Sequence, residues 1–461
     1  MLRTWVIGSL LFTVEAASSG SLRTLLYNVA GLPGTPLPLS PIFPSSSSFF
    51  RLTISELLSS SRPSRNTPYI SQRLANYDLI NVQEDFNYHA ALYASDAHPH
   101  RTPTSGGVPF GDGLNTLSNF PFMDFTRIGW TDCFINSGDC LTPKGFTFMR
   151  VQLDPHVWVD VYNLHTDAGS QSEDRKARRE NVAQIVKHIN TFSAGMPVVI
   201  MGDTNMRYTT ISDSARALVS GAAATDAWVQ TWKGGVAPAE DGVALSCPFP
   251  FPSTVTDQAT LSACETVDKI LYRSSPVLTL NATGMTNEHR VFVHPTTDDP
   301  LSDHYPLSAT LEWTVGNLRL SNVAGGPHGN HYNDIPALSA SPTTPSITTL
   351  TLSGGRRVDK ISASFDSIGE ISHGGSGGEA TSITLGAGET IVGVYACSGE
   401  KNGHTRVFYL RVTTSADRTL EAGRTTDDCV NMEQPESGFR VAGFWGRSGD
   451  EVDRVGVIWA K

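Results

Sequence analysis

Polar side chains that can bind a metal ion or donate hydrogen bonds recur at the ends of strand-like segments in the first two thirds of this sequence. Any one of them alone is more often a turn or helix-cap residue. Together they combine the carboxylate and amide oxygens that a hard divalent cation needs with two histidines that can donate to a charged substrate. The set therefore indicates metal-dependent phosphoryl chemistry. Its members are Asn28, Gln83 with Glu84, His165, Asp203 with Asn205, Asp268, and Ser302-Asp303-His304.

The segments that must position these residues alternate between strand and helix patterns from about residue 22 to 313. One amphipathic helix is predicted at 173–192, with Val182, Ile185 and Ile189 on its apolar face. A second helix is predicted at 67–76. The Pro- and Ser-rich stretch 33–68 is predicted to be a surface loop with a short helix near 52–58. Strands are predicted at 25–29, 79–82, 158–164 and 197–201.

From about residue 317 to 461 the helical pattern disappears. Short alternating runs at 347–352, 358–365 and 390–395 are separated by glycine turns, which is typical of an all-β module. Almost no spacer lies between the two regions at 315–320, so we expect the two domains to pack closely.

Composition limits the classes of protein that fit. The chain has 461 residues, with 41 Gly and 27 Pro, which disfavours a large helical bundle. Its 34 Lys and Arg against 45 Asp and Glu give a formal net charge of -11. That balance argues against indiscriminate binding to nucleic acid or anionic lipid, which needs clustered basic residues, but it leaves room for a local basic groove.

The first sixteen residues have the pattern of an export signal. Arg3 precedes an apolar stretch from Thr4 to Val14, and small residues follow, so cleavage is expected at Ala16. No other apolar run approaches the roughly 20 residues that span a bilayer. We therefore predict a signal peptide at 1–16, no transmembrane segment, and a secreted, extracellular protein.

The cysteine count agrees with an oxidising compartment, because it is even. Pairing of sequence neighbours is the simplest of roughly 15 connectivities. No cysteine belongs to a zinc-type CxxC pair, so structural zinc is not expected. Asn281 begins the one N-glycosylation sequon. The expected disulfide couples are Cys133 with Cys140, Cys247 with Cys264, and Cys397 with Cys429.

The ordered set of polar motifs resembles the endonuclease/exonuclease/phosphatase superfamily of metal-dependent phosphoesterases, across roughly residues 22 to 313. This resemblance implies an α+β fold, a four-layer α/β/β/α sandwich with the active site at one edge, in a catalytic domain at 22–315. It also implies that Glu84 binds Mg²⁺ (or Mn²⁺), with Asn28 beside it and Asp303 completing the metal or water shell.

The same resemblance assigns the remaining roles. Asp203 matches the residue that orients or deprotonates the attacking water, and Asn205 matches a donor to the phosphate. His165 and His304 are expected to donate to non-bridging oxygens of the phosphate, which stabilises the charge of the transition state. Asp268 is expected to fix the tautomer of His304.

The motifs are less specific for a substrate. Segments 112–121 and 139–146 resemble the sphingomyelinase branch, whereas 202–207 is similar to the inositol polyphosphate 5-phosphatase version of its motif. The Pro-x-Trp-x-Asp-Arg element of the 5-phosphatases is absent, since 265–269 stands in its place. The dense basic run 175–179 has helical spacing, which favours a solvated helix face over a groove for nucleic acid.

The last third resembles jacalin-related lectins across about residues 323 to 461, on its Gly-rich segments 325–329 and 373–378 and its final segment 443–456. The resemblance implies a β-prism domain whose sugar loop runs from Gly449 to Asp453. Asp453 would accept hydrogen bonds from sugar hydroxyls. The backbone N–H groups of Asp450 and Glu451, and the first Gly-rich loop at Gly326, would complete the site. Asp450 and Glu451 are acidic where an aromatic residue often stacks on the sugar.

Three hypotheses follow. The first is a secreted Mg²⁺-dependent phosphodiesterase that acts on a lipid (sphingomyelin-like) or small-molecule phosphodiester and is targeted by a carbohydrate-binding module. The second keeps the same catalytic residues in a secreted DNase-like endonuclease, with nucleic acid as substrate, or an inositol polyphosphate phosphatase. The third is a lectin with a silent hydrolase domain. The sequence leaves the oligomeric state open.

Overall fold

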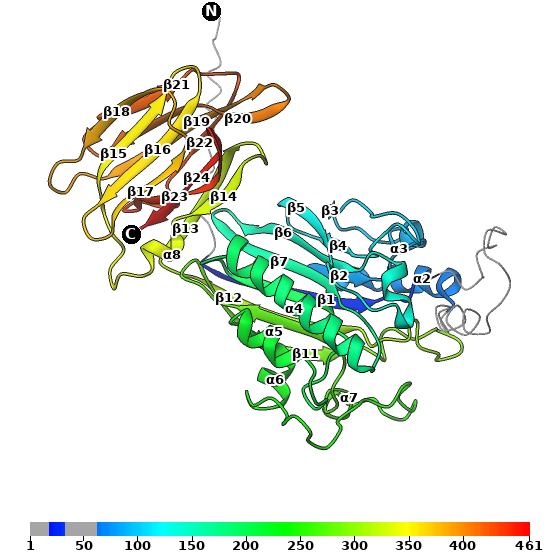
Figure 1. Cartoon of the computed structure of the whole chain (residues 1–461). Helices are drawn as coiled ribbons and strands as arrows, with labels where there is room; N and C mark the ends of the chain where they lie inside the picture. Colours follow the sequence, from blue (N-terminus) through cyan, green and yellow to red (C-terminus); the bar gives the residue numbers. More distant parts are fainter. Residues whose placement is uncertain (1–17, 33–61) are drawn as a thin grey trace, which may run out of the picture.

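The computed structural model describes residues 18–32 and 62–461. The signal peptide predicted at 1–16 and the short helix predicted near 52–58 lie outside these ranges. Two regions of different architecture are joined at Gly316 and Asn317 (Figure 1).

The first region is built on two six-stranded sheets. One has the order β11-β12-β1-β2-β4-β3 and the other the order β5-β6-β7-β8-β10-β9. The first sheet contains β1 (Ser19–Asn28), β2 (Leu79–Gln83), β3 (His100–Arg101), β4 (Asn115–Ser118), β11 (Leu278–Asn287) and β12 (Leu307–Val315). The second contains β5 (Phe122–Gly129), β6 (Gly145–Asp154), β7 (Val157–His165), β8 (Val198–Asp203), β9 (Thr225–Asp226) and β10 (Asp268–Arg273).

Helices cover both outer faces of this pair of sheets, and the predicted four-layer α/β/β/α arrangement is confirmed (Figure 1). α4 (Ser172–Phe192) buries Val182, Ile185 and Ile189 against the second sheet, because these apolar residues recur at helical spacing. The shorter elements are α2 (Pro63–Ser71), a 3₁₀ turn (Leu74–Asn76), α3 (His89–Leu92), a second 3₁₀ helix (Asn136–Leu141), α5 (Ala215–Gly221), α6 (Ala227–Trp232) and α7 (Gln258–Leu261).

The helix predicted at 67–76 has different bounds. α2 begins four residues earlier, with Pro63 in its first turn, where a missing N–H leaves no helical hydrogen bond unmade. It ends at Ser71, and only the 3₁₀ turn continues. α2 covers the outer face of the first sheet, where Ile70 packs with Leu25 and Ile80.

Buried polar side chains join the two sheets between their apolar faces. Asn81 of β2 donates to the backbone oxygen of Tyr162 on β7 at 3.0 Å, and Gln83 donates to the Asn163 side chain at 2.7 Å. Buried polar groups need such partners, so each bond fixes one strand against the other. These bonds fix how far β2 and β7 are shifted along one another, so that both strands end at the same edge of the sandwich.

The second region consists of three four-stranded sheets, as the predicted all-β β-prism requires. The first sheet contains β13 (Leu318–Gly325), β14 (Asn330–Asn333), β23 (Arg440–Ser448) and β24 (Val452–Ala460). The second contains β15 (Ile347–Gly354), β16 (Val358–Phe365), β17 (Gly369–Gly374) and β18 (Glu379–Thr384). The third contains β19 (Ile391–Lys401), β20 (His404–Thr414), β21 (Thr419–Gly423) and β22 (Asp428–Met432), and α8 (Ile335–Leu338) is a single short helix.

The three predicted disulfides are confirmed, since Cys133 bonds Cys140, Cys247 bonds Cys264 and Cys397 bonds Cys429. Asn281 of the sequon is exposed on β11. Within the described ranges, no helix combines the length and apolar character needed to cross a bilayer.

The β-prism is attached at one end of the two-sheet region. β12 follows His304 closely and runs for nine residues to Val315, which carries the chain about 30 Å away from His304. At that far end, Trp158 of β7 packs edge-to-face on Trp445 of β23, with ring centroids 5.8 Å apart. The two regions therefore share one apolar cluster.

A buried carboxylate also joins the two regions. Asp124 of β5 lies 2.6 Å from Arg454, 3.5 Å from Arg447 and 3.7 Å from His331, and its side chain is 1% exposed. Burial alone would raise the pKa of Asp124, but the nearby arginines, Arg454 foremost, hold it below its usual value. Asp124 is therefore charged and balances cations of the β-prism.

We predict that Asp124→Asn, which keeps the volume and suits the positive φ of 59° at this position, lowers the free energy of unfolding by about 3 kcal/mol. The loss arises because buried arginines are left without a counter-charge. The matched control is Glu436→Gln, which breaks the exposed pair with Lys461 and should cost less than about 1 kcal/mol. Chemical denaturation measures both, and equal losses would show that the buried pair does not stabilise the interface.

Candidate active site

Strand register brings the predicted catalytic residues to one edge of the sandwich. β1 and β2 are parallel, with Asn28 opposite Gln83. β7 and β8 are also parallel, with His165 opposite Asp203, and antiparallel β10 places Asp268 on the other side of Asp203. The ends of five strands from both sheets therefore meet where the chain carries its polar motifs.

Asp203 is the centre of this group. Its Oδ2 atom accepts a hydrogen bond from the Asn28 side chain at 3.1 Å and lies 3.3 Å from His165 Nε2 and 3.5 Å from His304 Nε2. Burial would raise the pKa of Asp203, but His304, His165 and Lys144 outweigh it and lower the pKa to about 2. Asp203 is thus a buried carboxylate that stays ionised.

His304 lies between two carboxylates. Its Nδ1 atom is 3.1 and 3.2 Å from the two oxygens of Asp268, and its Nε2 atom faces Asp203. Burial opposes protonation, yet Asp268 and Asp203 together raise the pKa of His304 well above its usual value. The ring is therefore an imidazolium at neutral pH, with a side chain 20% exposed toward the pocket. Asp268 contacts His304, and its role in fixing the tautomer of His304 stays a prediction.

His165 has the opposite protonation state. Burial, assisted by the positive charge of Lys144, lowers its pKa to about 3, so the ring is neutral. Its Nδ1 atom has no hydrogen-bond partner among the described residues. The two histidines of the site thus differ in charge, because His304 has two carboxylate neighbours, whereas His165 has one, Asp203, and also faces the positive charges of Lys144 and His304.

Glu84 and Asn28 form the candidate metal site. Glu84 follows β2 in a left-handed conformation, with φ of 59°, and its Oε1 atom accepts from Asn28 at 3.1 Å. Burial and the negative charge of Asp303 raise the pKa of Glu84. Carboxylate oxygens with excess negative charge are ligands that Mg²⁺ prefers, so Glu84 with Asp303 nearby fits this ion. Asn28, in contrast, directs its amide nitrogen at Glu84, and its Oδ1 atom accepts from the Ala30 N–H at 3.0 Å.

A second group of possible ligands overlaps this one. Single atoms of Asp203, Asp268 and His304 lie within 4.8 Å of one another. A protonated imidazole has no lone pair for a metal, and His304 holds its proton between the two carboxylates. The carboxylate oxygens around Glu84 are the other place where a hard cation could bind.

Asn205 is held beside Asp203 by the backbone. Its N–H donates to Asp203 Oδ1 at 3.0 Å, its φ is 50°, and its side-chain amide lies 3.3 Å from the Thr166 backbone oxygen. Asn205, Asp303 and His304 all line one pocket of about 430 Å³. Asn205 and His304 can donate hydrogen bonds to an anionic substrate group at the mouth of the site, whereas the Asp303 carboxylate next to them can only accept.

Lys144 is a site residue to which the sequence assigned no role. Its side chain is 12% exposed, forms an ion pair with Asp139, and lies 3.3 Å from the Thr166 backbone oxygen. Burial would lower its pKa, but Asp139, Asp203 and Glu84 raise it, so Lys144 stays charged. The signal was present as the Asp and the Lys-Gly pair of segment 139–146.

The basic run on α4 is only partly a solvated face. Lys176 and Arg179 are exposed, as predicted, but Arg178 is 2% exposed and lies 3.0 Å from Asp213. Arg178 also donates to the Gly169 backbone oxygen at 2.8 Å. Its charge is thus used to hold the loop after β7 and is not free for phosphate.

The predicted sugar loop of the β-prism is closed by its own ion pairs. Arg406 of β20 contacts Asp453, whose side chain is 1% exposed. Glu451 pairs with Arg357 at 2.7 Å and with Lys401 at 2.6 Å.

Backbone bonds hold the same loop. Gly326 donates its N–H to the Asp453 backbone oxygen at 2.8 Å, and Gly449 donates to Glu451 at 3.0 Å. Asp450 is exposed. Asp450 is therefore the one of the three acidic side chains of this loop that faces solvent.

Comparisons with known proteins match both regions. A model of Endonuclease/Exonuclease/phosphatase family 2 matches residues 44–236, and a model of the Jacalin-like lectin domain matches residues 321–458. Sphingomyelinases of Mycobacterium tuberculosis and Mycobacterium bovis are each 37% identical over 311 residues, which are 65% of this chain and 54% of theirs. The chain thus spans about half the length of these relatives.

Other similarities are more limited. Secreted RxLR effector protein 19 of Plasmopara viticola is 27% identical over 144 residues, 30% of this chain and 78% of that protein. The mannose-binding jacalin-related lectin AcmJRL of Ananas comosus is 19% identical and covers 32% of this chain and 99% of its own, with a TM-score of 0.27. Malaysian banana lectin is 25% identical and covers 30% of this chain and 96% of its own, with a TM-score of 0.26.

We predict that His304→Ala and His165→Ala each lower kcat for phosphodiester hydrolysis by about 10²-fold or more, because each removes a hydrogen-bond donor to the transition state. The control is His404→Ala, an exposed histidine of the β-prism, which should leave kcat unchanged. Steady-state kinetics on a soluble phosphodiester measures all three. A loss of less than about threefold in His304→Ala would remove this residue from the catalytic group.

Proposed function

The chain contains an endonuclease/exonuclease/phosphatase family 2 domain and a jacalin-like lectin domain, and on this premise we propose that it is a secreted, Mg²⁺-dependent phosphodiesterase. We take the catalytic domain as 22–315 and the lectin domain as 323–461. The observation that carries the proposal is the position of Asp203, whose Oδ2 atom lies 3.3 Å from His165 Nε2 and 3.5 Å from His304 Nε2.

This arrangement supports specific roles in hydrolysis. The imidazolium of His304 donates from Nε2 to a non-bridging phosphate oxygen, where negative charge accumulates in the transition state. Neutral His165 contributes a further N–H. A carboxylate with a pKa of about 2 is a weak base, so Asp203 orients the attacking water more than it removes its proton in the resting site. Asn205 holds the phosphate at the pocket mouth.

A divalent cation fits beside these residues. Glu84, Asn28 and Asp303 would hold Mg²⁺ or Mn²⁺, and the ion would supply Lewis-acid polarisation of the phosphate. The positive charge of Lys144, near Glu84 and Asp203, offsets the repulsion between the carboxylates of the site. Its position also suits contact with a phosphate oxygen.

For the substrate, we propose a lipid phosphodiester of the sphingomyelin type. The mycobacterial relatives are named sphingomyelinases, and their similarity extends over 311 residues. A nuclease needs a basic groove along the phosphate backbone, and Arg178, the central residue of the dense basic run, is already paired with Asp213. An endonuclease and an inositol polyphosphate phosphatase remain the alternatives that the assay must separate.

The lectin domain is proposed to bind carbohydrate and to concentrate the enzyme on glycan-bearing surfaces. Three disulfides agree with secretion into an oxidising compartment, and exposed Asn281 is available for glycosylation. A lectin with a silent hydrolase domain is the competing function from another class.

One assay separates these functions. Purified full-length protein is incubated with sphingomyelin vesicles, plasmid DNA, inositol polyphosphates and a soluble phosphodiester, with Mg²⁺ or with EDTA. Release of phosphocholine in Mg²⁺ is the expected result. Cleavage of DNA alone would favour the nuclease, release of inorganic phosphate alone would favour the phosphatase, and no hydrolysis would favour the silent domain.

We predict that Glu84→Gln abolishes the stimulation by Mg²⁺, because it removes the negative charge that draws the cation. Activity should fall by about 10²-fold or more, and calorimetric titration with Mg²⁺ should show a loss of binding heat. Glu240→Gln, an exposed carboxylate outside the site, is the control. Full activity of wild-type protein in EDTA would contradict a metal mechanism.

For the lectin loop, we predict that Arg406→Ala raises affinity for neutral sugars at least tenfold, because it frees the Asp453 carboxylate to accept from sugar hydroxyls. A glycan array with wild type, Arg406→Ala and Asp453→Ala reads this out. Arg411→Ala, an exposed arginine of the same strand, should match wild type. Equal profiles for wild type and Asp453→Ala, together with no gain in Arg406→Ala, would place sugar binding elsewhere.

A further inference from the structure

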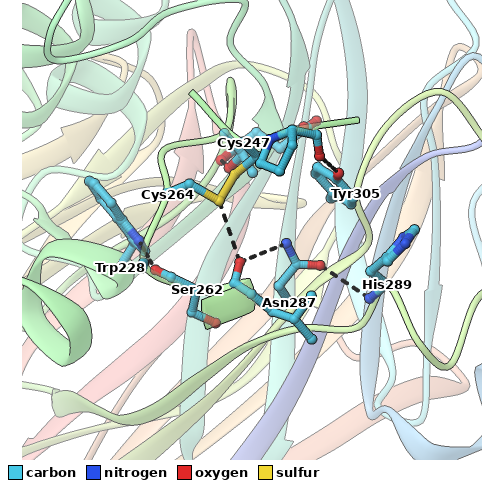
Figure 2. The surroundings of a disulfide bond; sticks show 12 residues. Trp228, Cys247, Ser262, Cys264, Asn287, His289 and Tyr305 are labelled. Carbon is cyan, nitrogen blue, oxygen red and sulfur yellow. Dashed lines mark hydrogen bonds between the residues drawn. A yellow bond between two sulfur atoms is a disulfide. The ribbon is translucent and has the colours of Figure 1, made fainter. Parts of the chain in front are cut away.

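A disulfide-closed loop stands beside the catalytic pocket and has no part in the chemistry described so far. Cys247 and Cys264 close it, and it carries the sequence Pro248-Phe249-Pro250-Phe251-Pro252. Figure 2 shows this disulfide with Tyr305 next to it. Tyr305 directly follows His304, so the loop and the catalytic imidazolium are neighbours in space.

The loop is held in one position by several independent contacts. The Tyr305 hydroxyl donates to the Pro248 backbone oxygen, and the rings of Phe249 and Phe251 each lie 5.1 Å from the Tyr305 ring. Arg290 donates to the Val255 backbone oxygen at 2.7 Å. Proline fixes φ at three of five consecutive positions, so little conformational freedom is left to lose when a ligand binds.

The two phenylalanines of the loop have different surroundings. Phe251 is 4% exposed and packs beneath Tyr305, so it anchors the loop. Phe249 is 46% exposed and lines the pocket of about 430 Å³ that also contains Asp303 and His304. The pocket therefore has an ionic wall, where the phosphate chemistry takes place, and an apolar wall formed by Phe249, the disulfide and Tyr305.

We propose that the Cys247–Cys264 loop is the element that binds the hydrocarbon part of a lipid phosphodiester, with Phe249 as its specificity-determining residue. This inference rests on the proposed phosphodiesterase function. When the apolar substituent of a phosphodiester lies next to its phosphate, the phosphate can contact the ionic wall while the hydrocarbon contacts the apolar wall. An exposed aromatic ring on a rigid loop gains free energy when hydrocarbon covers it and loses little entropy in return.

The position of the loop separates binding from chemistry. Phe249 offers no group that donates or accepts a proton, and its ring packs on the ring of Tyr305. Its removal should therefore weaken substrate binding and leave the chemical step unchanged. Such a change appears in KM and not in kcat.

The test compares Phe249→Ser with wild type on sphingomyelin vesicles and on a deacylated phosphocholine diester, glycerophosphocholine. Phe249→Ser should raise KM for sphingomyelin about tenfold or more, keep kcat within twofold, and leave kcat/KM for the deacylated diester unchanged. Phe249→Leu, which keeps an apolar side chain, should restore KM to within about threefold of wild type. Phe110→Ser removes a ring that is 85% exposed and does not line the pocket, and it should behave as wild type.

Other results would overturn the proposal. An unchanged KM in Phe249→Ser, an equal loss on both substrates, or an equal effect of Phe110→Ser would each show that Phe249 does not recognise hydrocarbon. Wild-type hydrolysis of the deacylated diester alone would refute the loop's role and keep the phosphodiesterase. Hydrolysis of neither substrate would remove the proposed function itself. Thermal unfolding of each variant verifies that the fold is retained.

Discussion

The structure of the site depends on one buried carboxylate. Asp203 lies at the end of β8 where the two sheets meet, and it stays ionised because donors from both sheets surround it. Asn28 at the end of β1 in the first sheet, His165 at the end of β7 in the second sheet, and His304 in the segment before β12 all contact Asp203. An unpaired charge at this depth would cost several kcal/mol, so the surrounding groups stabilise the fold and the charge pattern together. Because His304 has two carboxylate neighbours and His165 has one, the same network sets one ring charged and the other neutral.

The sequence predicted the architecture well wherever local pattern and burial agree. α4 was predicted because its apolar residues Val182, Ile185 and Ile189 recur at helical spacing, and that face is the one that packs on the second sheet. The disulfides followed from proximity of cysteines along the chain. Residues 67–76 were predicted less accurately, because Pro63 starts the helix upstream of the apolar pattern that was used to place it. Burial of Ile70 against the first sheet gives this helix a role that its own sequence does not reveal.

Contacts between distant segments were beyond the reach of sequence patterns. Motif order alone brought Asn28, Glu84, Asp203 and His304 into one hypothesis, and strand register then places them at one edge. Lys144 was not assigned a role, because the Asp and the Lys-Gly pair of segment 139–146 were used only for the resemblance to the sphingomyelinase branch. Arg178 was expected on a solvated face, yet Asp213 and the loop after β7 hold it inside. In the lectin domain, the sequence of the loop from Gly449 to Asp453 predicts an open sugar site. In the structure, Arg406 from another strand contacts Asp453 and covers it.

A double-mutant cycle on Asp203 and His304 tests this account most directly. Asp203→Asn, His304→Ala and the double variant are compared with wild type in kcat on a soluble phosphodiester, with Mg²⁺ present and thermal unfolding as the check on folding. If the carboxylate and the imidazolium act as one unit, each single variant loses about 10²-fold or more, and the double variant loses little beyond the worse single one. Losses that multiply in the double variant would show that the two groups act independently, and the central role given to Asp203 would be wrong.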